Sequence, residues 1–88
     1  MHYLLVRHRV ADFAKWHRVF VSHAEAQRDA GLHLLHLLRD SGDPNLVVML
    51  FRADDPEAAQ AFTGSPDARD AAEVSGVIGV PEVLLLSE

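Results

Sequence analysis

The amino-acid sequence predicts an α+β fold in which two helical regions cover one face of a four-stranded antiparallel sheet. Three observations support this fold. Residues 12–31 form an amphipathic segment that begins with a capping residue. Two apolar runs, 32–39 and 46–53, are joined by the loop DSGDPN, which is typical of a hairpin. A second helical region follows, and a last apolar run comes after it.

The first strand is expected over residues 2–9, HYLLVRHR, because this run is short, apolar at its centre and followed by a polar helix start. Asp12 is the expected N-cap of the first helix, and Gly31 is the expected residue just after its C-cap. We therefore expect one continuous helix of about five turns between them.

Leucine favours helix, so the propensity of LHLLHLLR alone would extend the helix beyond Gly31. We predict a strand at 32–39 instead, because glycine ends the helix and a hairpin loop follows. The partner strand at 46–53, LVVMLFRA, is rich in residues that favour strands.

The second helical region contains two helix-start signals, each a capping residue followed by proline. The first, Asp55 with Pro56, begins a helix that runs to about Phe62. The second, Ser65 with Pro66, begins a short helix that ends near Gly76, and residue 81 opens the last strand, PEVLLLSE. The order β-α-β-β-α-β is the split form of the ferredoxin-like motif.

The strands are apolar on both faces, whereas the helices can cover only one. The alternating sets are Leu46, Val48 and Leu50 against Val47, Met49 and Phe51, and Leu84 and Leu86 against Val83 and Leu85. We expect the open face of the sheet to bind a second copy of the chain, giving a homodimer, with an unrelated partner as the alternative.

Composition limits the classes of function. The 88 residues allow one domain, 1–88, which is small enough to gain stability from a partner. The net charge of −5 opposes nucleic-acid binding, and the absence of cysteine excludes disulfides and thiolate sites. The N-terminus has too short an apolar run for a signal peptide or a membrane span, so we expect a cytoplasmic location and no membrane partner.

The first helix carries the candidate site. At about 100° per residue, seven side chains share its apolar arc: Trp16, Val19, Phe20, His23, Ala26, Gln27 and Ala30. The candidate site residues among them are Trp16, Phe20, His23 and Gln27. Polar groups are costly to bury without partners, so this face is expected to line a cavity or to meet hydrogen-bond partners. Trp16 and Phe20 would hold a flat ligand, with Gln27 binding beside them, although aromatic residues at this spacing are often core.

His23 is the candidate catalytic residue, acting as an acid or base at the cavity wall. The alternative is a core histidine bonded to a backbone carbonyl. His8 or His36 could join the site if their strand faces point toward the helices, and we take His36 as a substrate-binding residue. No metal site is expected, because His33 and His36, three apart on a strand, should lie on opposite faces.

Nearly the whole chain resembles the dimeric α+β barrel superfamily, close to the antibiotic-biosynthesis-monooxygenase-like proteins. The segments that carry the resemblance are HYLLVRH, DFAKWHRVFVSHAEAQRDAG, DPNLVVMLFRADDPEAAQAF, SPDARDA and VPEVLLLSE. The resemblance implies a homodimer whose sheets meet as a barrel, with a cavity between the helices and the sheet of each subunit. Some relatives oxidise polycyclic phenols with oxygen and no cofactor, others open haem, and others isomerise or cyclise lactones and polyketides.

The haem-opening relatives resemble one another in an asparagine, a tryptophan and a helical histidine. Here the only asparagine, Asn45, lies in the hairpin loop, and residues 56–75 contain neither tryptophan nor histidine. Only Trp16 could replace the pocket tryptophan of the quinone-forming relatives, from a different element. We therefore expect no haem and no other cofactor.

The resulting hypothesis is a small-molecule pocket protein, acting as a cofactor-independent monooxygenase or as a cyclase or isomerase on an aromatic or polyketide-like compound. The alternative is a ligand-binding or interaction module on the same dimeric fold, without catalysis. A filled core with no pocket is a third hypothesis. An RNA-binding role is disfavoured by the acidic charge.

Overall fold

The computed structural model describes residues 1–88 and confirms the α+β, ferredoxin-like fold. The element order matches the β-α-β-β-α-β prediction, with each helical region divided in two. The elements are β1 (His2–Val10), α1 (Phe13–Ser22), α2 (Ala24–Asp29), β2 (Leu32–Arg39), β3 (Leu46–Ala53), α3 (Pro56–Thr63), α4 (Pro66–Ser75) and β4 (Val77–Ser87). None of the helices combines the length and the apolar character needed to cross a membrane.

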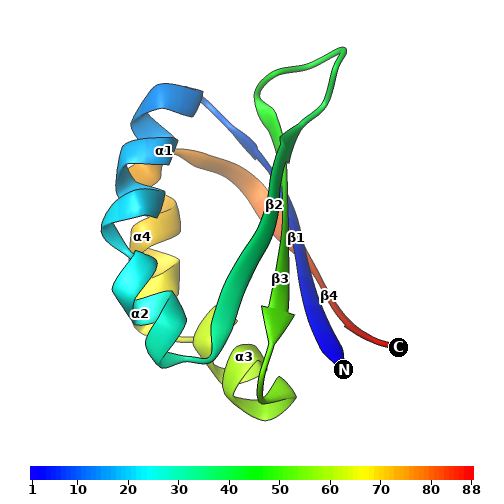
Figure 1. Cartoon of the computed structure of the whole chain (residues 1–88). Coiled ribbons are helices and arrows are strands. Elements are labelled where there is room, and N and C mark those ends of the chain that lie inside the picture. Colours follow the sequence, from blue (N-terminus) through cyan, green and yellow to red (C-terminus); the bar gives the residue numbers. More distant parts are fainter.

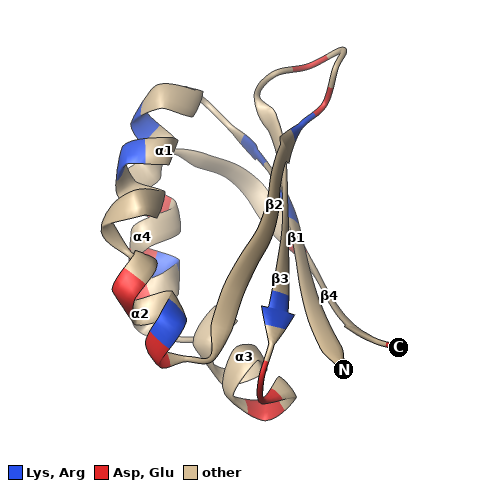
Figure 2. Cartoon of the chain, viewed as in Figure 1, with Lys and Arg blue, Asp and Glu red and all other residues tan.

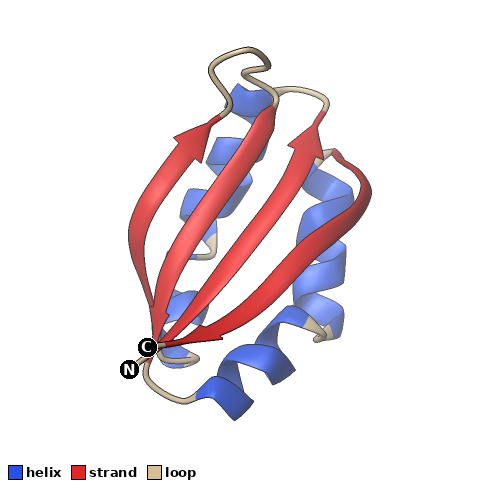
Figure 3. Cartoon of the chain, turned by 90° about the vertical axis from the view of Figure 1, so that its right-hand side faces the viewer, coloured by secondary structure: helices blue, strands red, loops and turns tan.

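The four strands pair antiparallel in the order β2-β3-β1-β4. All the helices lie on one side of this sheet (Figure 1), and the other side carries none (Figure 3). The two ends of the chain meet at one corner of the sheet, where the backbone N–H of Glu88 donates to the carbonyl of Met1 at 3.1 Å. The molecule therefore has two layers and one uncovered sheet face.

The core lies between the helices and the sheet. Its buried apolar residues are Leu4, Val10, Trp16, Leu32, Val47, Met49, Phe51, Ala53 and Ala59. Strand β3 alternates strictly between half-buried and buried positions, and Val47, Met49 and Phe51, one of the two sets expected from the sequence, face the helices. Apolar burial of this kind is the main contribution to the stability of a small domain.

The face without helices, which we call the open face, is also apolar. Its apolar residues are Leu5, Leu38, Leu46, Val48, Leu50, Ile78, Leu84 and Leu86. Leu38 and Leu84 remain 55% and 43% exposed. Lysine, arginine, aspartate and glutamate occur mainly on the helices and near the strand ends (Figure 2). The prediction that both faces of the sheet are apolar is therefore confirmed.

The prediction of one continuous first helix is wrong, because the helix is broken at His23. The backbone N–H of His23 donates to the carbonyl of Phe20 at 3.1 Å, three residues back, instead of to Val19. Two side chains bind the Val19 carbonyl oxygen instead. The Ser22 hydroxyl donates to it at 2.6 Å, and Nδ1 of His23 lies 3.0 Å from it. Side chains that compete for a helix carbonyl in this way bend or break a helix.

Strand β4 begins at Val77, earlier than the predicted start at Pro81. Gly76 adopts a left-handed φ of 84° and turns the chain from α4 directly into the strand. Pro81 is tolerated inside β4 because this is an edge strand. The pairing with β1 is interrupted, since β4 places residues 79–81 opposite the single residue His8.

A second irregularity corrects the expected placement of two histidines. The register of β2 against β3 shifts between Leu34 and His36, so that His33 and His36 both lie on the open face. His33 is engaged by a carboxylate: its Nε2 donates to Asp54 at 2.7 Å, and this hydrogen bond is the main cause that lowers the pKa of Asp54. No group of three or more potential metal-ligating side chains lies together.

Candidate functional site

A cavity of about 160 Å³ lies between the helices and the sheet. Of the 20 residues that line it, 14 are hydrophobic. Its polar lining consists of His8, His23, Gln27, Thr63 and Ser75, and it contains no lysine, arginine, aspartate or glutamate. A concave, mainly apolar lining with a few polar groups is typical of sites for small neutral molecules.

Four of the five sequence-predicted site residues meet at this cavity. Trp16 and Phe20 come from α1, Gln27 comes from α2, and His23 lies at the break between these helices. His36 does not line the cavity, because the register shift in β2 places it on the open face opposite Leu50.

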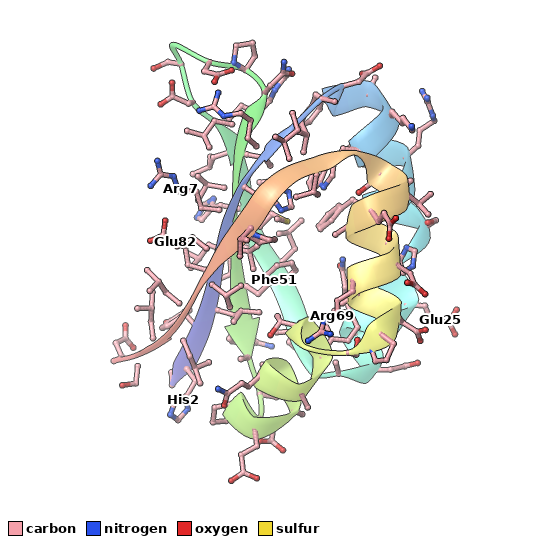
Figure 4. The ribbon with its side chains drawn as sticks, turned by 180° about the vertical axis from the view of Figure 1, so that it is seen from behind. His2, Arg7, Glu25, Phe51, Arg69 and Glu82 are labelled. Atoms are coloured by element: carbon pink, nitrogen blue, oxygen red, sulfur yellow. The ribbon has the colours of Figure 1, made fainter.

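Stacked aromatic rings form one wall of the cavity. Trp16 is buried, and its ring stacks on Phe20 with the centroids 4.9 Å apart. The ring centroid of Phe20 in turn lies 6.3 Å from that of Phe51 on β3. The side chain of Phe51 points toward the helices (Figure 4). Aromatic contacts at these distances stabilise one another and present flat surfaces to the cavity.

His23 has one anchored and one free ring nitrogen. Nδ1 is within hydrogen-bond distance of the Val19 carbonyl, at 3.0 Å, and of the Ser22 hydroxyl, at 3.1 Å. A carbonyl can only accept, so this contact assigns a proton to Nδ1 and the lone pair of the neutral ring to Nε2. Nε2 has no protein partner. Nδ1 is thus bonded to a backbone carbonyl, as expected for a core histidine, whereas Nε2 is available to a ligand.

His8, rather than His36, is the strand histidine at the cavity. It shares the helix-facing side of β1 with Leu4 and Val6, and its ring meets Trp16 edge to face at 5.4 Å. Its Nε2 is buried and has no hydrogen-bond partner. The alternation of residues 2–9 places these three side chains on one face, but the sequence does not show which face the helices cover.

Burial lowers the pKa of the His8 imidazole below its ordinary value. The folded protein therefore binds a proton at His8 less readily than the unfolded chain does. By linkage, this residue makes the free energy of unfolding fall as the pH drops below about 6.5, the ordinary histidine pKa.

We accordingly predict that His8→Leu narrows the gap in unfolding free energy between pH 7.5 and pH 5.0, measured by urea denaturation at both pH values. His2→Leu, at the end of the same strand, should leave the gap as it is in the wild type. If the unfolding free energies at pH 7.5 and pH 5.0 differ as much in His8→Leu as in the wild type, His8 does not contribute to this pH dependence.

The two hydroxyl groups in the lining are engaged within their own helical regions. Ser75 donates to the carbonyl of Ala72 at 3.1 Å, and Thr63 donates to that of Gln60 at 2.9 Å. Neither hydroxyl has a histidine as its hydrogen-bond partner. The arrangement therefore lacks an activated nucleophile and leaves the two imidazoles as the groups able to exchange a proton.

A wider groove of about 620 Å³ lies outside the cavity, between the two helical regions. It shares with the cavity the residues Val19, His23, Phe62, Ala68 and Ala71. Asp29, Asp67 and Asp70 also line the groove. His23 thus stands where the groove and the cavity meet, on a path from solvent to the interior.

Solved structures match this arrangement over nearly the whole chain. An antibiotic biosynthesis monooxygenase aligns with a TM-score of 0.71 and 16% identity, over 100% of this chain and 98% of its own. A candidate antibiotic biosynthesis monooxygenase from Bordetella bronchiseptica gives 0.80 and 14%, over 99% and 95%. The chain has the fold of the antibiotic biosynthesis monooxygenase-like proteins.

The monooxygenase-like fold also occurs in an uncharacterised NIPSNAP domain protein from Burkholderia xenovorans, with a TM-score of 0.67, 14% identity, and coverage of 100% of this chain and 94% of that one. Neither protein-family models nor curated proteins match the chain. At these identities the likeness shows a shared fold, and any function must be argued from the cavity itself.

Proposed function

We propose that the cavity binds a small, largely apolar molecule the size of one aromatic ring, and that His23 exchanges a proton with it. The observation that carries this proposal is the cavity of about 160 Å³ with its apolar lining and two imidazoles. An apolar protein cavity of about 150 Å³ is known to hold benzene, whereas larger ligands occupy about 300 Å³ or more. Among aromatic and polyketide-like compounds, the volume thus favours single rings.

His23 is suited to proton transfer because its Nδ1 contact fixes the ring orientation and leaves the Nε2 lone pair free. The names of the structural neighbours suggest oxygen chemistry, so the reaction we propose is monooxygenation of a phenol. One phenol and one dioxygen contain the atoms of one benzoquinone and one water. One oxygen of dioxygen becomes a ring carbonyl, and the other leaves as water. His23 takes the proton of the ring carbon and passes it to this water, whose second proton comes from the phenol hydroxyl.

Binding without chemistry is the second candidate. It is favoured by the hydroxyls of Ser75 and Thr63, which already donate to helix carbonyls and leave few groups to act on a substrate. The two candidates share the same cavity and differ only in turnover.

Ring binding can be followed by the fluorescence of Trp16, the only tryptophan, and turnover by oxygen uptake with phenol as the substrate. We predict that His23→Ala still binds phenol but consumes oxygen at least about 100-fold more slowly than the wild type, the usual scale for a lost general base. His17→Ala, on the same helix but outside the cavity lining, is the matched control and should retain wild-type activity.

An unchanged rate in His23→Ala would contradict the proton-transfer role of this residue. Binding of phenol by the wild type without oxygen uptake would favour the non-catalytic module.

We further propose that the open face binds a second copy of the chain. Every strand contributes at least one aliphatic side chain to this face, and Leu50, Leu5 and Leu84 lie in one row with His36. Its main charged pair, Arg7 with Glu82 at 3.3 Å, is mutually neutralised and points away from the helices (Figure 4). Two acidic chains can therefore approach through this face without strong repulsion, and homo-oligomers with a two-fold axis are the commonest assemblies.

A further inference from the structure

We propose that Nε2 of His8 binds a hydroxyl group of the ring molecule, which makes the ligand a neutral phenol rather than a plain hydrocarbon or an acid. This inference rests on the proposed function, since it requires a ring in the cavity. It adds a second polar contact, from the sheet, to the one offered by His23 from the helices.

The imidazole of His8 has an unpaired nitrogen. Nε2 of His8 is the one buried side-chain nitrogen or oxygen that has no hydrogen-bond partner in this structure. Native proteins rarely leave such an atom unpaired, because the lost hydrogen bond to water is costly. The other cavity-lining residues of β1 and β3 are Leu4, Val6, Met49 and Phe51, which are apolar and offer it no hydrogen-bond partner. A polar group of a ligand in the cavity would supply the missing hydrogen bond.

Strand β4 is irregular at the position opposite His8. Residues 79–81 lie opposite His8, so this residue has no regular cross-strand neighbour on β4. Gly79 there has a left-handed φ of 75°, and Pro81 lines the cavity. Strand irregularities are common beside binding sites, where they open space around a side chain. The fold thus leaves room beside the unpaired imidazole.

The chemistry of His8 selects a neutral hydroxyl. Burial lowers the pKa of the imidazole, which is therefore neutral near pH 7. The tautomer of His8 is not fixed by any hydrogen bond, so Nε2 either donates or accepts, and a hydroxyl can serve both. A carboxylate ligand would enter a lining without a single lysine or arginine and would lose its hydration without compensation.

The test compares phenol with toluene, which replaces the hydroxyl by a methyl group of similar size. Dissociation constants are measured by Trp16 fluorescence for the wild type, His8→Leu and, as a control on the opposite face, His36→Leu. We expect the ratio of the toluene constant to the phenol constant to fall about tenfold in His8→Leu, the effect of one buried hydrogen bond. It should not change in His36→Leu.

Nitrogen NMR of the histidine side chains in the wild-type protein gives a second readout, which does not depend on the folding of a variant. We expect phenol to shift the Nε2 resonance of His8 and toluene to leave it nearly unchanged. If both ligands bind but neither the ratio of their dissociation constants nor the resonance depends on the hydroxyl, this inference is overturned. If neither ligand binds, both this inference and the proposed function are contradicted.

Discussion

Trp16→Ala is expected to lower the free energy of unfolding by about 3–5 kcal/mol, the usual loss for a buried tryptophan. The side chain is only 3% exposed and contacts the rings of His8, Phe13 and Phe20. Small domains have a low free energy of unfolding, so this variant should be only marginally folded. The measurement is urea denaturation followed by circular dichroism.

Val21→Ala is the matched control, because Val21 lies on the same helix and is 55% exposed. Its effect should stay within about 0.5 kcal/mol, as for most surface substitutions. A loss below about 1 kcal/mol for Trp16→Ala would mean that this side chain is not part of a packed core in solution.

Leu50→Asp is expected to abolish association of the chain. Leu50 lies on β3, one of the two inner strands, in a row with Leu5 and Leu84 on the open face. A charge placed without a partner in an apolar interface costs about 3–5 kcal/mol, so the dimer dissociation constant should rise at least about 100-fold. Sedimentation velocity at micromolar concentration should show a dimer for the wild type and a monomer for this variant.

Val21→Asp makes the same kind of change on the helical layer, away from the open face, and should leave the dimer intact. A wild-type chain that sediments as a stable monomer at this concentration would contradict the proposed homodimer.

Local signals predicted most of the fold. Asp12 accepts hydrogen bonds from the backbone N–H groups of Ala14 and Lys15, as an N-cap should, and Gly31 and Gly76 adopt the left-handed conformation after their helices. Each of these features depends on a few neighbouring residues, and the sequence therefore contains the information needed to predict it.

The candidate site was predictable only in part. The helical period brought Trp16, Phe20, His23 and Gln27 together correctly, because their spacing along one helix face survives the break at His23. His36 was misplaced, because a single extra residue in β2 reverses the side of the sheet that the following side chains face. Such a bulge is set by pairing with another strand and leaves no local signal in the sequence.

The most direct test of the cavity as a ligand site is a crystal structure of the wild-type protein grown with phenol. We expect electron density for one ring between the helices and the sheet, in contact with Trp16 and Phe20 and within reach of His23. A cavity filled by water or side chains, with phenol bound elsewhere or nowhere, would contradict it.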